Sequence, residues 1–144
     1  MLFVHSLLRY VVLLLVLAAF LAHLRDWILR RPIIVWERTA AILALVACHV
    51  QLVVGIALYG MNATVIHSQN PGAWWRFILH VHAASMLAAI VLVTAGRMLS
   101  KRAKDERMKQ LWVVVGYGLG LALMAYATPW PFTEIGRTFG KGWL

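Results

Sequence analysis

Four long apolar segments, separated by short polar connections, dominate the pattern of hydrophobic and polar positions along the chain. They cover residues 2–23, 39–59, 74–96 and 111–128. A helix needs roughly 20 apolar residues to cross a hydrocarbon layer of about 30 Å, and each segment is close to that length. The runs are continuous and lack the two-residue alternation of barrel strands. The pattern therefore predicts one domain of four transmembrane helices.

The composition supports this interpretation. Of the 144 residues, 62% are hydrophobic and 13% are charged, whereas soluble domains are about 45–50% apolar and about 25% charged. A domain of this size cannot bury such an excess of apolar side chains in its own core, so we expect the remainder to face lipid. The single cysteine, Cys48, excludes a disulfide framework and a thiolate metal site.

The basic residues predict the orientation of the chain. Arg25, Arg30, Arg31 and Arg38 follow the first segment, and Arg97, Lys101, Arg102, Lys104, Arg107 and Lys109 follow the third. Helices of alternating direction place both connections on one side, which the positive-inside rule assigns to the cytoplasm. We expect an all-α, up-down-up-down bundle in the bacterial inner (cytoplasmic) membrane, with both termini extracytoplasmic. Basic runs between apolar segments indicate topology here, and no nucleic-acid partner is expected.

One pair of glycines predicts a close helix contact. Gly116 and Gly120 form a GxxxG motif in the fourth segment. Glycines at this spacing let two membrane helices approach closely, so we expect the fourth helix to pack tightly on a neighbour.

Several ionisable side chains fall inside the predicted helices, where each costs about 2.5–3.5 kcal/mol on insertion scales. His49 lies at the middle of the second segment, His80 and His82 lie in the third, and His5 lies near the outer end of the first, with Arg9 one turn deeper. At about 1.5 Å per residue, all of them lie at the centre or in the outer half of the membrane. His23 and His67, by contrast, fall at the interface and in the outer loop.

His80 and His82 are about 200° apart on a helix, so only one of them is expected to face the bundle. The face of His82 continues through Ser85 and Ala89 to Gly96, a stripe of small residues that would leave room for a bulky group. This stripe favours His82 as the inward histidine.

Intramembrane histidines on several helices suggest a haem site. Neutral imidazole is a strong ligand of haem iron, and we expect His49 and His82 as the axial pair, with His5 as the alternative partner. Arg9 and Arg76 lie near the outer surface and could bind the haem propionates through charge-assisted hydrogen bonds. The simpler alternative is that the histidines form hydrogen bonds between helices.

Other chemistries are less well supported by the sequence. All five acidic residues lie outside the predicted segments, which disfavours a hydrolytic triad or a carboxylate proton pathway. A copper or zinc site built from His5, His49 and His82 is possible, although these residues differ in depth. Quinone binding is also possible, with Arg9 and His5 or His82 near the outer surface, while Gln51 lies about 200° from His49 and cannot easily share one ligand with it.

Five sequence motifs resemble a known family. They are HSLLRY from His5, HVQLVVGIALY from His49, HVHAASM from His80, GRMLSKR from Gly96 and TPWPF from Thr128. Together they resemble small four-helix bacterial membrane proteins described as cytochrome b-like, and the resemblance covers essentially the whole chain. It singles out His5, Arg9, His49, Gln51 and His82. In the family an acidic residue precedes the histidine that matches His82, whereas this chain has Val81 there.

We therefore expect a b-type cytochrome-like subunit that binds haem b and transfers electrons within a respiratory or photosynthetic membrane complex, rather than a stand-alone enzyme. Its expected partners are lipid and other integral membrane subunits. The alternatives are a cofactor-free accessory or assembly subunit, motivated by Gly116 and Gly120, and a quinone-binding subunit.

Overall fold

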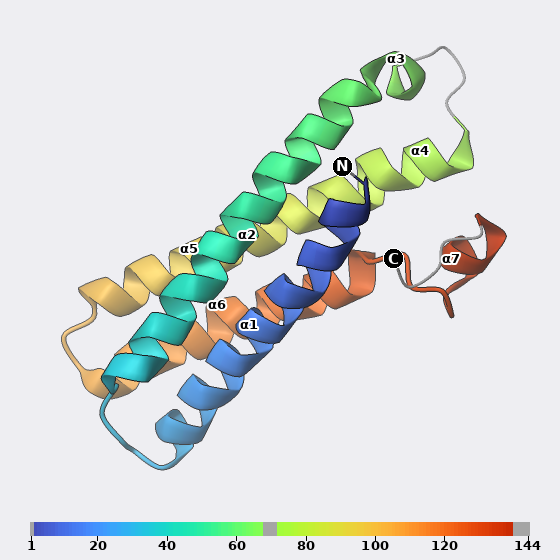
Figure 1. The fold of residues 1–144 in the computed structure, drawn as a ribbon. Coiled ribbons are helices and arrows are strands. Elements are labelled where there is room, and N and C mark those ends of the chain that lie inside the picture. The colour runs from blue at the N-terminus through green and yellow to red at the C-terminus, as the bar shows by residue number, and fades with distance from the viewer. Residues whose placement is uncertain (1, 68–71, 140–144) are drawn as a thin grey trace.

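The computed structural model describes residues 2–67 and 72–139, and within these residues every regular element is a helix. The elements are α1 (Leu2–Ile28), α2 (Val35–Met61), α3 (Ala63–Ile66), α4 (Ala73–Phe77), the π-helix η1 (Ile78–Ala83), α5 (Ala84–Arg102), α6 (Glu106–Ala127) and α7 (Glu134–Thr138). The segments α4, η1 and α5 follow one another without a break and form one long helix (Figure 1).

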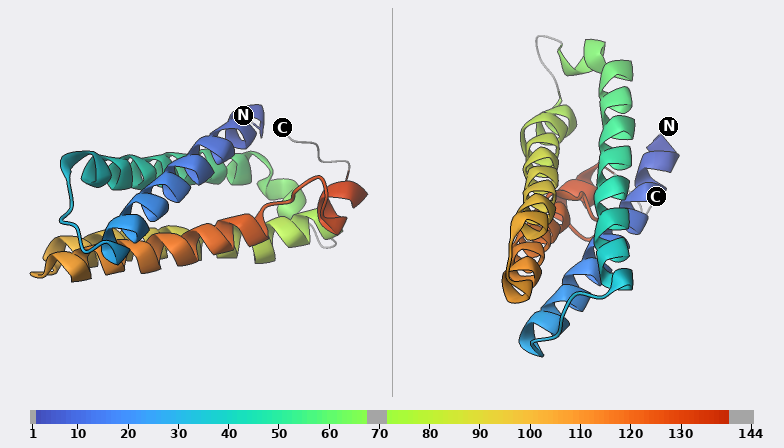
Figure 2. Two further views of the ribbon diagram at one scale, coloured as in Figure 1. Left: turned by 90° about the horizontal axis from the view of Figure 1, so that it is seen from below. Right: turned by 90° about the vertical axis from the view of Figure 1, so that its left-hand side faces the viewer.

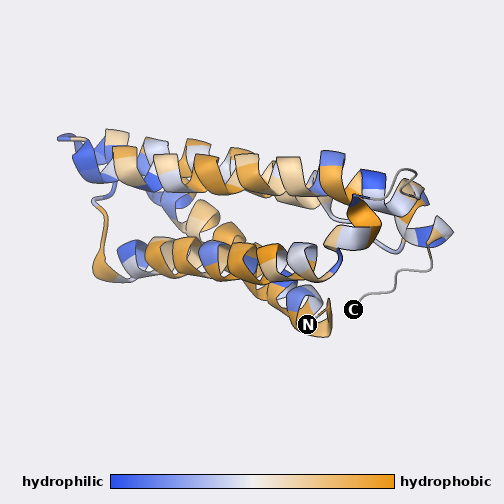
Figure 3. Cartoon of the chain, turned by 90° about the horizontal axis from the view of Figure 1, so that it is seen from above, coloured by the Kyte–Doolittle hydropathy of each residue, from blue (hydrophilic) through white to orange (hydrophobic). Residues whose placement is uncertain are grey.

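The prediction of four membrane-spanning helices is confirmed. Among the described residues, four helices are long and apolar enough to cross a membrane: Leu2–Ile28, Val35–Met61, Ala73–Arg102 and Glu106–Ala127. Hydrophobic residues cover their length, whereas hydrophilic residues gather mainly toward the helix ends and their connections (Figure 3). The chain is therefore a multi-pass membrane protein.

The helices are longer than the sequence predicted. The first continues to Ile28 and the second begins at Val35, so Asp26 and Glu37 lie inside helices and not outside them as expected. Both carboxylates are almost completely buried and both bind Arg25. This ion-pair network satisfies charged groups at the helix ends, which lets the helices extend beyond their apolar segments.

The connections after α1 and after α5 lie at the same end of the molecule, which we call the basic end (Figure 1). The N-terminal start of α1 and the elements α3, α4 and α7 lie toward the other end, which we call the histidine end because His5 and His82 lie on that side. Helix α1 packs against α2 and α6, and α5 packs mainly against α6. Figure 2 shows α5 and α6 running alongside each other while α1 crosses them obliquely.

Glycines produce the close contact between α5 and α6, as the GxxxG motif predicted. A Cβ atom placed on Gly116 would lie 2.6 Å from the carbonyl oxygen of Leu92 and 2.7 Å from the Cα of Gly96. On Gly120 it would lie 2.8 Å from a methyl group of Val93. Real Cβ atoms cannot approach neighbours so closely, so only glycine allows this crossing.

Candidate functional site

Two histidines from different helices meet at the histidine end of the bundle. The imidazole centroids of His5, on α1, and His82, on η1, are 6.2 Å apart, and the ring planes make an angle of 67°. Both side chains are partly buried. The structure thus brings together the preferred ligand His82 and the alternative ligand His5.

Two prolines determine how His82 is held. If α6 continued, the N–H groups of residues 129 and 131 would donate to the carbonyl oxygens of Ala125 and Ala127. Residues 129 and 131 are both prolines, which have no N–H to donate. The helix ends at Ala127. Side chains satisfy both carbonyls instead, because Trp130 Nε1 donates to Ala125 at 2.8 Å and His82 Nδ1 donates to Ala127 at 2.9 Å.

This hydrogen bond also determines which ring nitrogen of His82 carries the proton. A carbonyl oxygen can only accept, so Nδ1 of His82 carries the proton. In the neutral ring, Nε2 then presents a lone pair. An imidazole oriented in this way, through a backbone carbonyl, is the usual arrangement of a metal-binding histidine.

His82 lies in a π-helical segment of six residues, Ile78–Ala83, between α4 and α5. Such segments are rare and occur frequently at functional sites. The wider turn changes the direction in which the following side chains point, so His80 and His82 need not follow the spacing of an ideal α-helix. Hydrophobic periodicity alone gives no signal of a π-helix, and the sequence analysis did not predict one.

On the opposite side of the pair, His5 is held by α2. Gln51 Nε2 donates to the backbone carbonyl of His5 at 2.8 Å. Gly55 lies beside the ring, since a Cβ added there would be at contact distance, 3.5 Å, from Cε1 of His5. Nδ1 of His5 and Oε1 of Gln51 are buried and have no hydrogen-bond partner among the described residues. Buried polar atoms without a partner are uncommon and often mark a missing ligand or water.

Arg9 and two aromatic rings complete the site. The guanidinium of Arg9 lies over the rings of Tyr10 and Trp130, at 4.7 Å and 5.6 Å from their centroids, and Nη2 donates to the hydroxyl of Tyr10 at 3.0 Å. The rings of His5 and His82 lie within the electrostatic range of the Arg9 charge. A cation is therefore present where the sequence placed one.

The remaining predicted residues point elsewhere. His49 is exposed on α2, and its Nδ1 donates to the carbonyl of Leu45 in its own helix at 2.8 Å. His80 and Arg76 are also exposed. The structure therefore does not bring His49 to His82, and no group of three His, Cys, Asp or Glu residues that could hold a metal ion is found in residues 2–67 and 72–139. The copper or zinc alternative thus has no support.

The stripe of small residues after His82 has a different role from the one expected. Ala89 and Gly96 are buried, and they contact Gly120 and Gly116 of α6 respectively. The stripe is therefore filled by the neighbouring helix and does not leave room for a cofactor.

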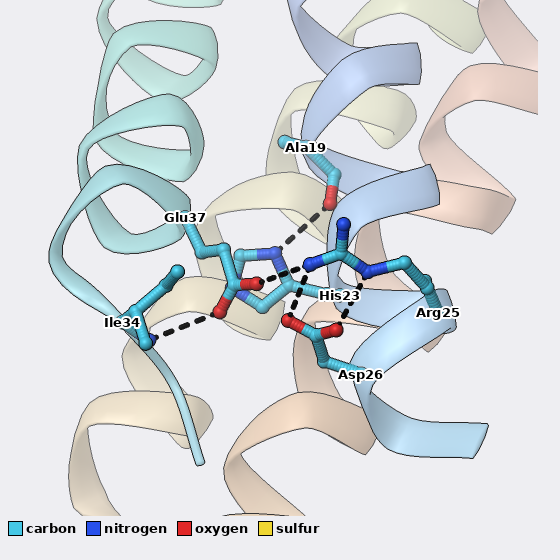
Figure 4. Close-up of polar contacts among 6 residues, drawn as sticks. All are labelled: Ala19, His23, Arg25, Asp26, Ile34 and Glu37. Carbon is cyan, nitrogen blue, oxygen red and sulfur yellow. Dashed lines mark hydrogen bonds and ion pairs between the residues drawn. The ribbon is translucent and has the colours of Figure 1, made fainter. Parts of the chain in front are cut away.

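A second polar cluster, at the basic end, was missed by the sequence analysis (Figure 4). Arg25 binds Asp26 at 2.7 Å and Glu37 at 3.2 Å, and Glu37 also accepts from the backbone N–H of Ile34 at 3.0 Å. His23 was expected at the membrane interface, but it is 1% exposed and its Nδ1 donates to Ala19 at 2.9 Å. Hydropathy alone placed these residues outside the bundle because it does not register their pairing.

No known protein family, curated protein or solved structure matches this chain. The resemblance to cytochrome b-like proteins therefore stays a prediction.

Proposed function

We propose that this chain is a haem-binding, b-type cytochrome-like membrane subunit in which His5 and His82 would hold the haem iron. The separation of the two rings is the observation that supports it. Bonds between a metal and an imidazole nitrogen are about 2 Å long, so two imidazoles on opposite sides of one iron have centroids about 6 Å apart. The observed separation of 6.2 Å equals that spacing.

The donor set fits the same ligand. Neutral imidazole binds haem iron, the carbonyl of Ala127 holds His82 with Nε2 available, and His5 has a buried nitrogen without a hydrogen-bond partner among the described residues. Arg9 would bind a propionate, where a cation balances the carboxylate charge. When bound, haem supplies one-electron oxidation and reduction, and the role of this chain is to hold the iron, exclude water and set its potential.

A single redox centre needs an electron donor and an electron acceptor. The proposal therefore implies redox partners in or at the same membrane, in agreement with a subunit of an electron-transport complex. In this proposal the chain transfers electrons between partners and is not a stand-alone enzyme.

The orientation belongs to the same proposal. The connections that carry most basic residues lie at one end of the bundle (Figure 1), and the positive-inside rule supports placing this end in the cytoplasm of a bacterium. The helices then run up-down-up-down, both termini are extracytoplasmic, and His5 and His82 lie in the outer half of the membrane.

One observation favours a second candidate, a cofactor-free accessory subunit. The hydrogen bond from His82 to Ala127 joins the third spanning helix to the end of the fourth, and such a bond is sufficient reason for a buried histidine. In this case His82 stabilises the bundle and binds no iron.

A difference spectrum distinguishes the two candidates. The protein is expressed with haem supply, purified in detergent, checked for helicity by circular dichroism, and recorded in its dithionite-reduced and oxidised states. We expect the sharp α band of a six-coordinate haem b. Fully helical protein with no visible absorbance, copurifying with stoichiometric membrane partners, would support the accessory subunit instead.

A further inference from the structure

A cavity of about 270 Å³ lies at the basic end of the bundle, far along the helices from His5 and His82. Its polar lining consists of His23, Arg38, Arg97, Ser100, Lys101 and Lys109. These residues come from all four spanning helices. The volume is many times the about 15 Å³ that a single water needs, so the cavity can hold a polar group larger than water.

The charges around the cavity do not balance. The two buried acids nearby, Asp26 and Glu37, both bind Arg25 (Figure 4), and neither of them lines the cavity. The exposed Glu106 forms an ion pair with Lys109. Asp105 caps α6 by accepting from the backbone N–H of Met108 at 2.9 Å. None of these four acidic side chains lines the cavity.

Three cations of the lining remain without an ion pair. Arg97, Lys101 and Arg38 have no hydrogen bond or ion pair from their side chains within residues 2–67 and 72–139, although the charge of Arg38 also acts on Glu106. Arg97 is partly buried, and its charge acts on the buried His23. Gathering like charges around one partly enclosed space is unfavourable unless an anion occupies it.

A buried amide that follows the lining residue Lys109 in the sequence lacks a polar partner within the part of the chain that the structure describes. Gln110 is completely buried, and neither its Nε2 nor its Oε1 has a hydrogen-bond partner among the described residues. It lies on α6 between Lys109 and Val113, which both line the cavity. Buried amides without partners are uncommon, and bound water or a polar ligand group in the adjacent cavity would satisfy them.

We propose that this cavity binds the phosphate group of an anionic phospholipid. A phosphate has several strong acceptor oxygens, which suit the guanidinium of Arg97, the ammonium of Lys101 and the hydroxyl of Ser100 together. The cavity lies where spanning helices end, at the level of lipid headgroups. Basic pockets between transmembrane helices are suited to such headgroups. This site shares no residue with the proposed haem site and does not depend on it.

Lipid-dependent stabilisation tests the proposal. The purified full-length protein is transferred to nanodiscs of phosphatidylcholine with or without phosphatidylglycerol, and its thermal unfolding is followed by circular dichroism. We expect phosphatidylglycerol to raise the unfolding temperature. The variant carrying Arg97→Gln and Lys101→Gln should lose this effect and bind a fluorescent phosphatidylglycerol at least about tenfold more weakly.

A matched variant controls for net charge. Arg102→Gln with Lys104→Gln removes the same charge from the same end of the bundle, but both residues are exposed and neither lines the cavity. This control should keep the lipid response within about twofold of the unmodified protein. Equal losses in the two double variants would show general attraction between a basic surface and anionic lipid, and would overturn the proposal of a site.

Two further experiments complete the test. In one, inorganic phosphate is added to the protein in phosphatidylcholine nanodiscs, at the same phosphate concentration that phosphatidylglycerol supplies. We expect no rise in the unfolding temperature. If inorganic phosphate stabilises the protein and phosphatidylglycerol does not, the ligand is a soluble anion and the lipid assignment is wrong. If the Arg97 variant does not fold, Lys101→Glu at its exposed position should still weaken lipid binding, and an unchanged affinity would reject the proposal.

Discussion

His82 Nδ1 donates to the carbonyl oxygen of Ala127 at 2.9 Å, and this bond exists because the residue four positions after Ala127 is a proline. Pro131 has no N–H, so the last turn of α6 leaves an acceptor that a side chain from another helix can use. A sequence feature that ends one helix therefore orients a histidine on its neighbour.

Replacing both prolines tests this relationship directly. Pro129→Ala together with Pro131→Ala removes both breaks, so α6 can extend and the restored N–H of residue 131 can compete with His82 for the carbonyl of Ala127. If His82 holds iron, the loss of this support should weaken haem binding by about tenfold, as loss of such outer contacts does in other metal sites. The measurement is a titration of the apoprotein with haem. Pro32→Ala, at an exposed position of the first connection, is the control and should bind haem normally.

Single replacements of the histidines identify the ligands. His5→Ala and His82→Ala should each abolish the spectrum of six-coordinate haem, because each removes one side of the pair. His49→Ala and His80→Ala should leave it unchanged, since both side chains are exposed and His49 bonds to its own helix. Visible spectra of the four purified variants provide the comparison. Loss of haem in the His49 variant with retention in the His5 variant would show that the sequence-predicted pair, His49 and His82, was correct.

Arg9 should affect the redox potential more than Arg76. A nearby cation stabilises the reduced, less positive centre, so Arg9→Gln should lower the midpoint potential by roughly tens of millivolts. Arg76 was also a candidate from the sequence, but it is exposed on α4, and Arg76→Gln should change the potential little. Spectroscopic redox titration measures both. Equal shifts of the midpoint potential in the two variants would mean that Arg9 is no closer to the haem than Arg76.

The four helices were predictable because the bilayer imposes their length and apolar character. The face that each helix turns toward its neighbours was not predictable. In a membrane protein the faces toward lipid and toward the core are both apolar, so hydropathy cannot tell them apart. The faces differ in side-chain size instead. Ala41, Ala44 and Cys48 form the buried side of α2, and this small-residue spacing would have placed His49 on the adjacent, lipid-facing side.

The sequence predicted part of the candidate site. Depth in the membrane limited the candidates to a few histidines, of which the structure brings His5 and His82 together, and TPWPF was noted as a motif. What was missed is the physical consequence of Pro129 and Pro131, which free two carbonyls at the histidine end. Counting the backbone acceptors that prolines leave without donors would have predicted that side chains must satisfy the carbonyls of Ala125 and Ala127.

The glycine contact between α5 and α6 makes a prediction about stability. A Cβ on Gly96 would lie 2.7 Å from the carbonyl oxygen of Trp112 and 3.0 Å from the Cα of Gly116, so Gly96→Ala should force the helices apart and cost about 1–3 kcal/mol of unfolding free energy. Gly60→Ala is the control, because an added Cβ there meets nothing within 4 Å. Unfolding in mixed micelles with increasing dodecyl sulfate measures the difference, and equal stability of the two variants would contradict it.

The orientation of the bundle can be tested at two exposed positions on opposite ends. Lys104 lies in the short connection between α5 and α6, and Thr64 lies on α3. In a background with Cys48→Ala, spheroplasts of the Thr64→Cys variant should react with a membrane-impermeant maleimide, because the proposed orientation places the histidine end outside the cytoplasm. The Lys104→Cys variant should react only after permeabilisation, because the positive-inside rule holds the basic connections in the cytoplasm. Labelling of Lys104→Cys in intact spheroplasts would reverse the orientation, and the histidine pair would then lie in the inner half of the membrane.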